Sequence, residues 1–160
     1  MSDRIPMTRA GYDKIKAEHD RLHSVELPKI LEQLGTARGE GDLSENAEYD
    51  AAQENRAMME ARINVLRDKL ARAVLIDPKN MPRGQVGFGC TVKVKDLEFD
   101  DEEEFTLVGA GEEDYNVGKI LVTSPLAQGL VEKKVGDRVE IEVPQGTLKF
   151  EILEIRFDEE

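Results

Sequence analysis

Residues 38–52 read RGEGDLSENAEYDAA, and this stretch decides the fold because it separates two long helical patterns. Glycine favours a turn over a helix, and Gly39 and Gly41 stand where the first pattern ends. Two helices joined by so short a segment fold back on each other. The stretch therefore predicts an antiparallel helical hairpin whose arms, at 1.5 Å per residue, are each roughly 45 Å long.

The first arm is expected over residues 8–37. Thr8 is a candidate N-cap, and apolar side chains follow at mostly three- and four-residue steps. The steps slip between Leu22 and Leu27, directly before Pro28, which lacks the amide hydrogen that a helix needs. We therefore expect this helix to be kinked or interrupted there. The predicted seam consists of Ile15, His19, Leu22, Leu27, Ile30, Leu34 and Ala37.

The second arm is expected over residues 45–75, with a cleaner seam. Most residues between the apolar positions are charged, so this helix buries one narrow stripe only. The stripe consists of Ala52, Met59, Ile63, Leu66, Leu70 and Ala73.

After the segment DPKNMPRG the periodicity changes from helical to alternating. Five short β-branched runs follow, separated by turn-like segments that contain glycine. Ser124 and Pro125 begin one short helix, as its cap and its first residue. The fold class is therefore α+β: a helical hairpin over 1–76, a linker over 77–84, and over 85–160 a mainly antiparallel sheet domain with one short helix.

Composition excludes several classes of protein. The formal net charge is −12, which argues against a free-standing duplex nucleic-acid binder because such a protein needs a basic surface. The single cysteine, Cys90, excludes an internal disulfide and fits a reducing compartment. The charged N-terminal residues lack the apolar core of a signal peptide, and no apolar run is long enough to span a membrane. We expect a cytoplasmic protein.

Carboxylates crowd the connection of the hairpin. Asp42, Glu45 and Glu48 follow one another at three-residue steps. A structural interpretation is a variant of the capping box, since acids in a first helical turn bind free amides and suit the helix dipole. However, the stretch from Arg38 to Glu54, both included, contains six acids, more than capping requires. Magnesium is commonly held by one or two carboxylates plus water and phosphates. Asp42 and Glu45 therefore also resemble half of a metal site that a partner completes.

Other candidate sites are weaker. His19 and His23 stand four residues apart, but no third His or Cys lies near them in the sequence, so they are expected to be helix-surface or seam residues. Cys90 has no evident histidine partner and is expected to be buried. Neither of the glycine-rich segments GFGCTV (residues 87–92) and GAGEED (residues 109–114) matches a phosphate-binding loop followed by a helix. Arg38 and Arg56 could contact a phosphate backbone near the connection.

The motif GDLSENAEYDAA, after a long helix, resembles the Gre family of bacterial transcript-cleavage factors. The resemblance extends to IPMT at residues 5–8, to IDPKNMP, and to VTSPLAQGL in the second half. It covers nearly the whole chain in the right order. It implies an antiparallel coiled coil followed by an FKBP-like domain in which peptidyl-prolyl isomerase activity is not expected.

The resemblance also implies a partner, RNA polymerase. The second domain would dock at the rim of the secondary channel through Ser124, Pro125 and Leu126, while the coiled coil enters the channel. Asp42 and Glu45 match the acidic pair that helps to hold a second Mg²⁺ ion for cleavage of the nascent RNA 3′ end in backtracked complexes. This ion is shared with the polymerase and is not expected to bind stably to the free chain. In this interpretation the protein is not itself an enzyme.

The resemblance assigns RNA contact to Arg38 and leaves two features unexplained. Gln53 stands where many relatives carry a second basic residue, so contact with RNA would be weaker or would depend on Arg56. The acidic run DDEEE at residues 100–104 has no evident role.

Two other functions remain open. Glu40 and Glu48 could capture the metal unproductively, which would make the protein a channel-blocking inhibitor without cleavage activity. A stand-alone isomerase or chaperone is a third possibility, although fold is a weak argument for activity. The free protein is expected to be monomeric.

Overall fold

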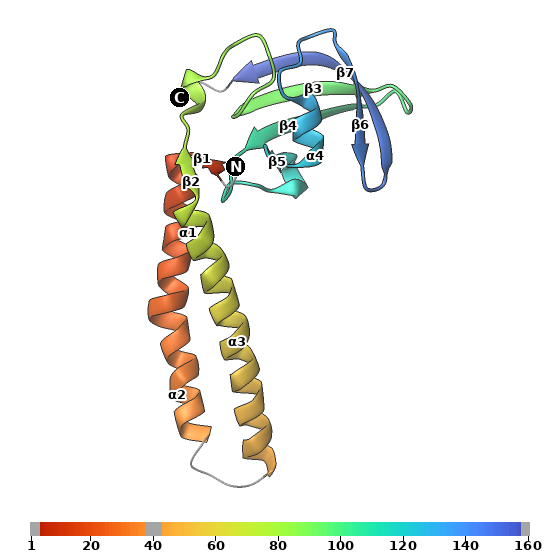
Figure 1. The fold of residues 1–160 in the computed structure, drawn as a ribbon. Helices are drawn as coiled ribbons and strands as arrows, with labels where there is room; N and C mark the ends of the chain where they lie inside the picture. Colours follow the sequence, from red (N-terminus) through yellow and green to blue (C-terminus); the bar gives the residue numbers. More distant parts are fainter. Residues whose placement is uncertain (1–3, 38–42, 158–160) are drawn as a thin grey trace. The chain divides into compact units, whose positions relative to one another are not determined.

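The computed structural model describes residues 4–37 and 43–157, and no side chain between residues 36 and 46 is included (Figure 1). Contacts divide the chain into two units. The helical unit is Asp13–Ala73, and the sheet unit combines the described residues of Met1–Tyr12 with those of Val74–Glu160. This division differs from the sequence-based boundaries of 1–76, 77–84 and 85–160, since the start of the chain groups with its second half.

The first arm of the hairpin consists of α1 (Arg9–Arg21), η1 (Leu22–Glu26) and α2 (Leu27–Ala37), and the second arm is α3 (Leu43–Ala71). The element η1 is one π-helical turn, in which the amide of Leu27 donates to the carbonyl oxygen of Leu22. This five-residue bond absorbs the slip in the apolar pattern. It lies directly before Pro28, whose missing amide could not have continued the α-helical bonding. The predicted interruption of the helix is confirmed. It is a π-helical turn, which contains one residue more than an α-helical turn.

The two arms bury most of the predicted seam. The second arm is shorter than the predicted 45–75, because α3 ends at Ala71 and Ala73, the last predicted seam position, begins strand β2 (Ala73–Leu75). Along the first arm Ile15, Leu22 and Leu34 are 4%, 7% and 8% exposed, and the other described seam residues, His19, Leu27 and Ile30, are half-buried. Along α3 the buried positions are Ala52, Ile63 and Leu66, with exposed fractions of 5%, 3% and 1%. Full burial of each large aliphatic side chain contributes about 1.5–3 kcal/mol, so this stripe is the main source of hairpin stability.

The sheet unit contains a five-stranded sheet in the order β5-β4-β3-β7-β6. All neighbours are antiparallel except β4 and β5, which run parallel, so the sheet is mixed. All five predicted strands are present. Their bounds are β3 (Cys90–Asp96), β4 (Glu102–Val108), β5 (Lys119–Leu121), β6 (Arg138–Val143) and β7 (Gly146–Phe157).

The single predicted helix of this unit is α4 (Pro125–Leu130), which packs on β6. Ser124 caps it, because its Oγ accepts from the amide of Ala127 at 3.3 Å. The buried side chains between α4 and the sheet form one apolar core. The expected fold class is confirmed: an α+β protein with a helical hairpin and a sheet domain crossed by one short helix.

The start of the chain is built into the sheet unit. Strand β1 (Ile5–Met7) pairs with β2 (Ala73–Leu75), and the side chain of Met7 is wholly buried. Two glycines allow this close packing. A Cβ on Gly109 would lie 2.6 Å from Met7 Cα, and one on Gly11 would lie 2.6 Å from the carbonyl oxygen of Ala110. Both distances are shorter than van der Waals contact, so a larger residue at either position would push residues 7–11 away from residues 109 and 110 within the sheet unit.

Thr8 connects the first helical turn to a distant loop. Its Oγ1 accepts from the amide of Gly11 at 3.0 Å, which confirms the predicted N-cap, and it donates to Oε1 of Glu112. The segment predicted as a linker is also structured. It contains η2 (Pro78–Asn80), a 3₁₀ turn capped by Asp77, whose Oδ1 accepts from the amide of Lys79 at 2.9 Å.

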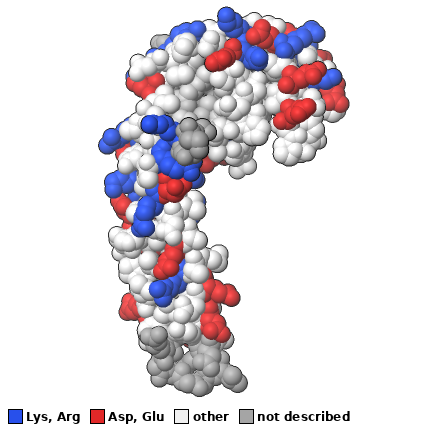
Figure 2. Space-filling view, viewed as in Figure 1, with Lys and Arg blue, Asp and Glu red and all other residues white. Residues whose placement is uncertain are grey.

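The acidic run at residues 100–104 forms cross-strand ion pairs. Lys93 Nζ lies 3.1 Å from Glu102 Oε1, and Lys95 Nζ lies 2.9 Å from Asp100 Oδ1. Hydrogen bonds to these carboxylates raise the pKa of both lysines. Arg156 on β7 completes the set by donating to Glu104 Oε1 at 2.8 Å. The visible face of the sheet unit accordingly shows both signs of charge interspersed (Figure 2). Exposed pairs of this kind contribute little to stability because water and salt screen them.

Candidate functional site

The predicted carboxylate pair lies at the limit of the described structure. Asp42 and Arg38 lie outside the described residues. Glu45 falls in the first turn of α3, which begins at Leu43, but its side chain is not among those described. The roles assigned to these three residues therefore stay predictions. The described part of α3 places Glu48, with an exposed side chain, one turn after Glu45.

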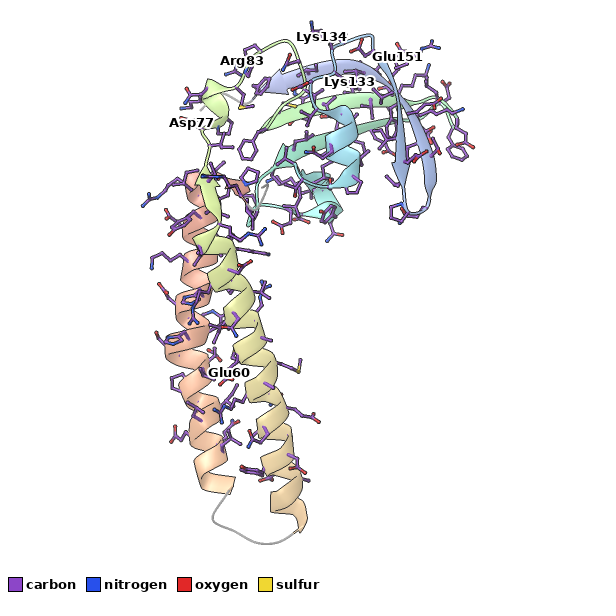
Figure 3. All side chains as sticks on the ribbon, viewed as in Figure 1. Glu60, Asp77, Arg83, Lys133, Lys134 and Glu151 are labelled. Atoms are coloured by element: carbon purple, nitrogen blue, oxygen red, sulfur yellow. The ribbon has the colours of Figure 1, made fainter. Side chains whose placement is uncertain are left out.

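A polar notch lies between α2 and α3, close to this end of the hairpin. It has a volume of about 210 Å³, and Gln53 Nε2 donates to the phenol oxygen of Tyr49 at its wall, at 2.9 Å. Arg56, a predicted RNA-contact residue, also lines it. The Nε of Arg56 donates to Glu60 Oε1 at 3.0 Å, and Glu60 is labelled on the hairpin in Figure 3. The complete lining is Leu31, Leu34, Gly35, Tyr49, Gln53 and Arg56.

The two histidines pack as seam and surface residues. The rings of His19 and His23 are stacked, with centroids 5.9 Å apart and an interplanar angle of 5°. His19 Nδ1 lies 3.0 Å from Asp20 Oδ1, and this bond, together with Lys16, lowers the pKa of the Asp20 carboxyl. Within residues 4–37 and 43–157, no group of three His, Cys, Asp or Glu side chains is arranged to hold a metal ion.

Cys90 at the start of β3 is fully buried. Burial raises the pKa of its thiol, which opposes formation of the reactive thiolate. The structural interpretation of this cysteine is confirmed.

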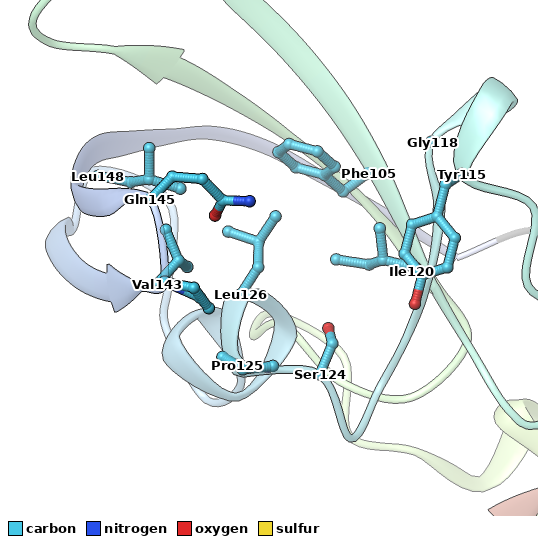
Figure 4. A pocket seen from close by; sticks show the side chains of 11 residues that line it. Phe105, Tyr115, Gly118, Ile120, Ser124, Pro125, Leu126, Val143, Gln145 and Leu148 are labelled. Atoms are coloured by element: carbon cyan, nitrogen blue, oxygen red, sulfur yellow. The ribbon is translucent and has the colours of Figure 1, made fainter.

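The sheet unit has an apolar pocket at the N-terminus of α4 (Figure 4). Its volume is about 380 Å³, and it is lined by the three predicted docking residues, Ser124, Pro125 and Leu126. Figure 4 shows Leu126 lying between the side chains of Val143 and Ile120, which come from β6 and β5. The rest of the lining is Phe105, Tyr115, Gly118, Pro144, Gln145 and Leu148.

Sequence reasoning did not assign most of this lining. The structure places the aromatic side chains of Phe105 and Tyr115 at the pocket, and no local sequence pattern predicts this position. The turn PQG after β6 is a recognisable hairpin signal, but its position beside α4 depends on the strand order, which the local sequence does not state.

The described part of the chain contains no helix that is both long and apolar enough to cross a membrane.

Comparison with known proteins identifies the family. The model of the N-terminal domain of GreA/GreB transcription elongation factors matches residues 5–75, and the model of the GreA/GreB C-terminal domain matches residues 81–157. The transcription elongation factor GreA of Thermodesulfovibrio yellowstonii is 48% identical over 99% of this chain and 100% of its own length. That of Chlorobaculum parvum is 47% identical over 97% of this chain and 98% of its own.

Among solved structures, GreA factor homolog 1 of Thermus thermophilus is 26% identical, with a TM-score of 0.45, over 96% of this chain and 99% of that one. The two family models together cover both the hairpin and the sheet unit, and the curated relatives match nearly end to end. The chain therefore belongs to the GreA/GreB family of transcription elongation factors.

Proposed function

We propose that this protein inserts its helical hairpin into the secondary channel of RNA polymerase and stimulates cleavage of backtracked nascent RNA, which rescues arrested complexes. Family membership supports a role in transcription elongation. The observation that carries the proposal is the hairpin itself. Helix α3 has 29 residues, which corresponds to about 43 Å of helix, and it buries only a narrow stripe. Such a long, thin hairpin is suited to entering a narrow channel of a partner protein.

In this proposal Asp42 and Glu45 supply carboxylates in trans, and the protein is not an enzyme by itself. In the sequence the two carboxylates stand three residues apart. Carboxylate oxygens are the ligands that Mg²⁺ takes, and two of them leave most of its shell to the polymerase and to RNA phosphates. When bound, the ion supplies stabilisation of charge at the phosphodiester and activation of a water. The role of this chain is to position the two carboxylates, which leave the polymerase channel again when the hairpin is withdrawn.

RNA contact is assigned to Arg38 and Arg56. The side chain of Arg56 is 43% exposed, and its hydrogen bond to Glu60 Oε1 is donated by Nε, so the terminal nitrogens can still donate to another group. A guanidinium held in this way can donate to a phosphate oxygen of the extruded strand.

Docking on the polymerase is assigned to the pocket at the N-terminus of α4. Its lining is mostly apolar, and Pro125 at the rim is exposed. A concave apolar site bounded by a few polar groups, here Ser124 and Gln145, is suited to receive a side chain of a partner protein.

The test is cleavage of labelled RNA in a stalled, backtracked polymerase complex with Mg²⁺. The wild-type protein, Asp42→Asn, Glu45→Gln and the matched control Glu48→Gln are compared. Each substitution removes one negative charge and keeps the size of the side chain. We expect accelerated release of a short 3′ fragment with the wild type and with Glu48→Gln, and loss of that acceleration with the other two variants. Normal cleavage by Glu45→Gln would refute the role of the pair.

The alternative is a channel-blocking inhibitor. The exposed side chain of Glu48, one turn after Glu45, keeps this function open because crowded carboxylates could hold the metal unproductively. It predicts suppressed nucleotide addition by an active complex with no short RNA released, and Glu48→Gln would then relieve the inhibition.

A further inference from the structure

The notch between α2 and α3 combines the side chains that recognise an unpaired nucleobase. One wall is the Tyr49 ring, half-buried on α3, and the facing wall on α2 is formed by Leu31 and Leu34. Leu31 is 43% exposed, so apolar surface remains available in the notch. At Gly35 no described atom outside its own stretch of helix lies within 4 Å of the position that a Cβ would take, so this residue adds no side chain to the notch. The notch can therefore receive a flat ring against Tyr49.

The polar atoms of the notch fit the edge of a base. Gln53 Nε2 donates to the phenol oxygen of Tyr49, so the phenol hydrogen can still be donated outward. The amide oxygen of Gln53 has no described partner and remains an acceptor. Arg56, oriented by Glu60, adds terminal guanidinium donors. A donor, an acceptor and an aromatic face together are the groups by which proteins hold single-stranded RNA bases.

A phosphate fits this notch less well than a base. One guanidinium is present, and Glu60 lies against it. The Gln53 amide adds no charge where a second cation would be expected for a phosphate site. A phosphate is recognised chiefly by cations and amide hydrogens, whereas a neutral base edge needs both a donor and an acceptor.

We propose that this notch binds one base of the extruded RNA, stacked on Tyr49 and hydrogen-bonded by Gln53. The inference rests on the proposed function, since that function brings RNA to the hairpin. The helix sets the distance: Tyr49 follows Glu45 by one turn and Arg56 follows it by three, which corresponds to axial distances of roughly 6 and 16 Å. The notch thus holds a nucleotide beside the scissile phosphate and positions the strand for cleavage.

The first experiment is a double-mutant cycle in which substitutions in the protein are combined with removal of single bases from the RNA. Backtracked complexes carry an extruded RNA with an abasic ribonucleotide at one position at a time. Wild type, Tyr49→Leu, Tyr49→Phe and the control Met58→Ala, an exposed residue of the same helix outside the notch, are compared. Loss of aromatic stacking on a base corresponds to a decrease of roughly 5- to 150-fold when the ring is removed.

We expect one abasic position to slow wild-type cleavage by such a factor. Tyr49→Leu slows cleavage of intact RNA similarly and shows no further loss on that abasic RNA, whereas Tyr49→Phe retains the ring and most of the rate. Met58→Ala behaves as wild type. The proposal would be overturned if the losses of cleavage rate caused by Tyr49→Leu and by the abasic nucleotide were additive in free energy at every RNA position. Helix content by circular dichroism shows whether Tyr49→Leu keeps the hairpin folded, and Tyr49→Phe with Gln53→Ala tests the hydrogen bonds if it does not.

A second experiment separates this inference from the proposed function. An extruded RNA carrying 4-thiouridine is crosslinked in the complex with Glu45→Gln, so the result does not depend on cleavage. Crosslinks to the α3 peptide that contains Tyr49 and Gln53, reduced severalfold by Tyr49→Leu, support the notch even if wild type fails to stimulate cleavage. Crosslinks that fall elsewhere on the chain overturn it even if stimulation is normal.

Discussion

Truncation of Leu66 tests whether the narrow seam holds the hairpin together. Leu66 on α3 is 1% exposed, and its neighbour Val65 is 46% exposed on the same helix. Leu66→Ala removes three buried carbons, worth about 0.8 kcal/mol each, and adds a cavity penalty. Helix propensity returns only a few tenths of a kcal/mol. The seam is one residue wide, so the arms can close part of the cavity, and we expect a loss of about 2–3 kcal/mol.

The measurement is urea unfolding followed by circular dichroism of the helix signal, with Val65→Ala as the matched control. Val65→Ala removes a partly exposed side chain and is expected to cost about 0.5 kcal/mol or less. The helix signal is used because the two units need not unfold in one transition. If Leu66→Ala and Val65→Ala shifted the midpoint equally, the buried stripe would not be the main source of hairpin stability.

Three further predictions concern the sheet unit. Gly109→Ala places a Cβ 2.6 Å from Met7 Cα and should destabilise by about 1–3 kcal/mol, measured by thermal unfolding; an unchanged midpoint would contradict the close packing of β1. Burial raises the pKa of Cys90, so less thiolate is present at any given pH; alkylation by iodoacetamide at pH 8 should be slow in the folded protein and fast in urea, and rapid labelling without urea would contradict it. Leu126→Glu should weaken binding to RNA polymerase at least tenfold in a competition assay, because it places an unpaired charge in the apolar pocket, whereas Val135→Glu on an exposed loop should not; equal effects would reject this docking surface.

Periodicity predicted the hairpin and the five strands of the large sheet because these elements each present a regular apolar face. It also located the irregularity before Pro28, although not its form, since a kink and a π turn produce the same slip in the pattern. Strand β1 was missed because Ile5–Met7 is too short to show alternation, and its partners lie about 70 and 100 positions away. The notch was missed for a related reason. Tyr49 and Gln53 stand on the predicted second arm, but Leu31 and Gly35 meet them only when the arms pair in this register.

The role of the acidic run at residues 100–104 also required the structure. The letters DDEEE do not indicate that β4 pairs with β3, where Lys93 and Lys95 alternate with buried valines. Asp42, Glu45 and Arg38 are the reverse case, because the sequence motif that singles them out is specific while their side chains lie outside the described residues.

The burial of Met7 has a consequence for the order in which the chain matures during synthesis. Thr8 contacts Glu112, 104 positions later, and the amide of Ile76 donates to the carbonyl of Met7 at 2.9 Å. The hairpin is complete once α3 has left the ribosome, whereas β1 has to wait for the loop at Gly109 before Met7 is covered. Contacts so distant in sequence form slowly. The nascent hairpin therefore exists for a time with an unburied N-terminal strand, and pulse-labelled hydrogen exchange during refolding should find the amide of Ile76 protected after those of α3.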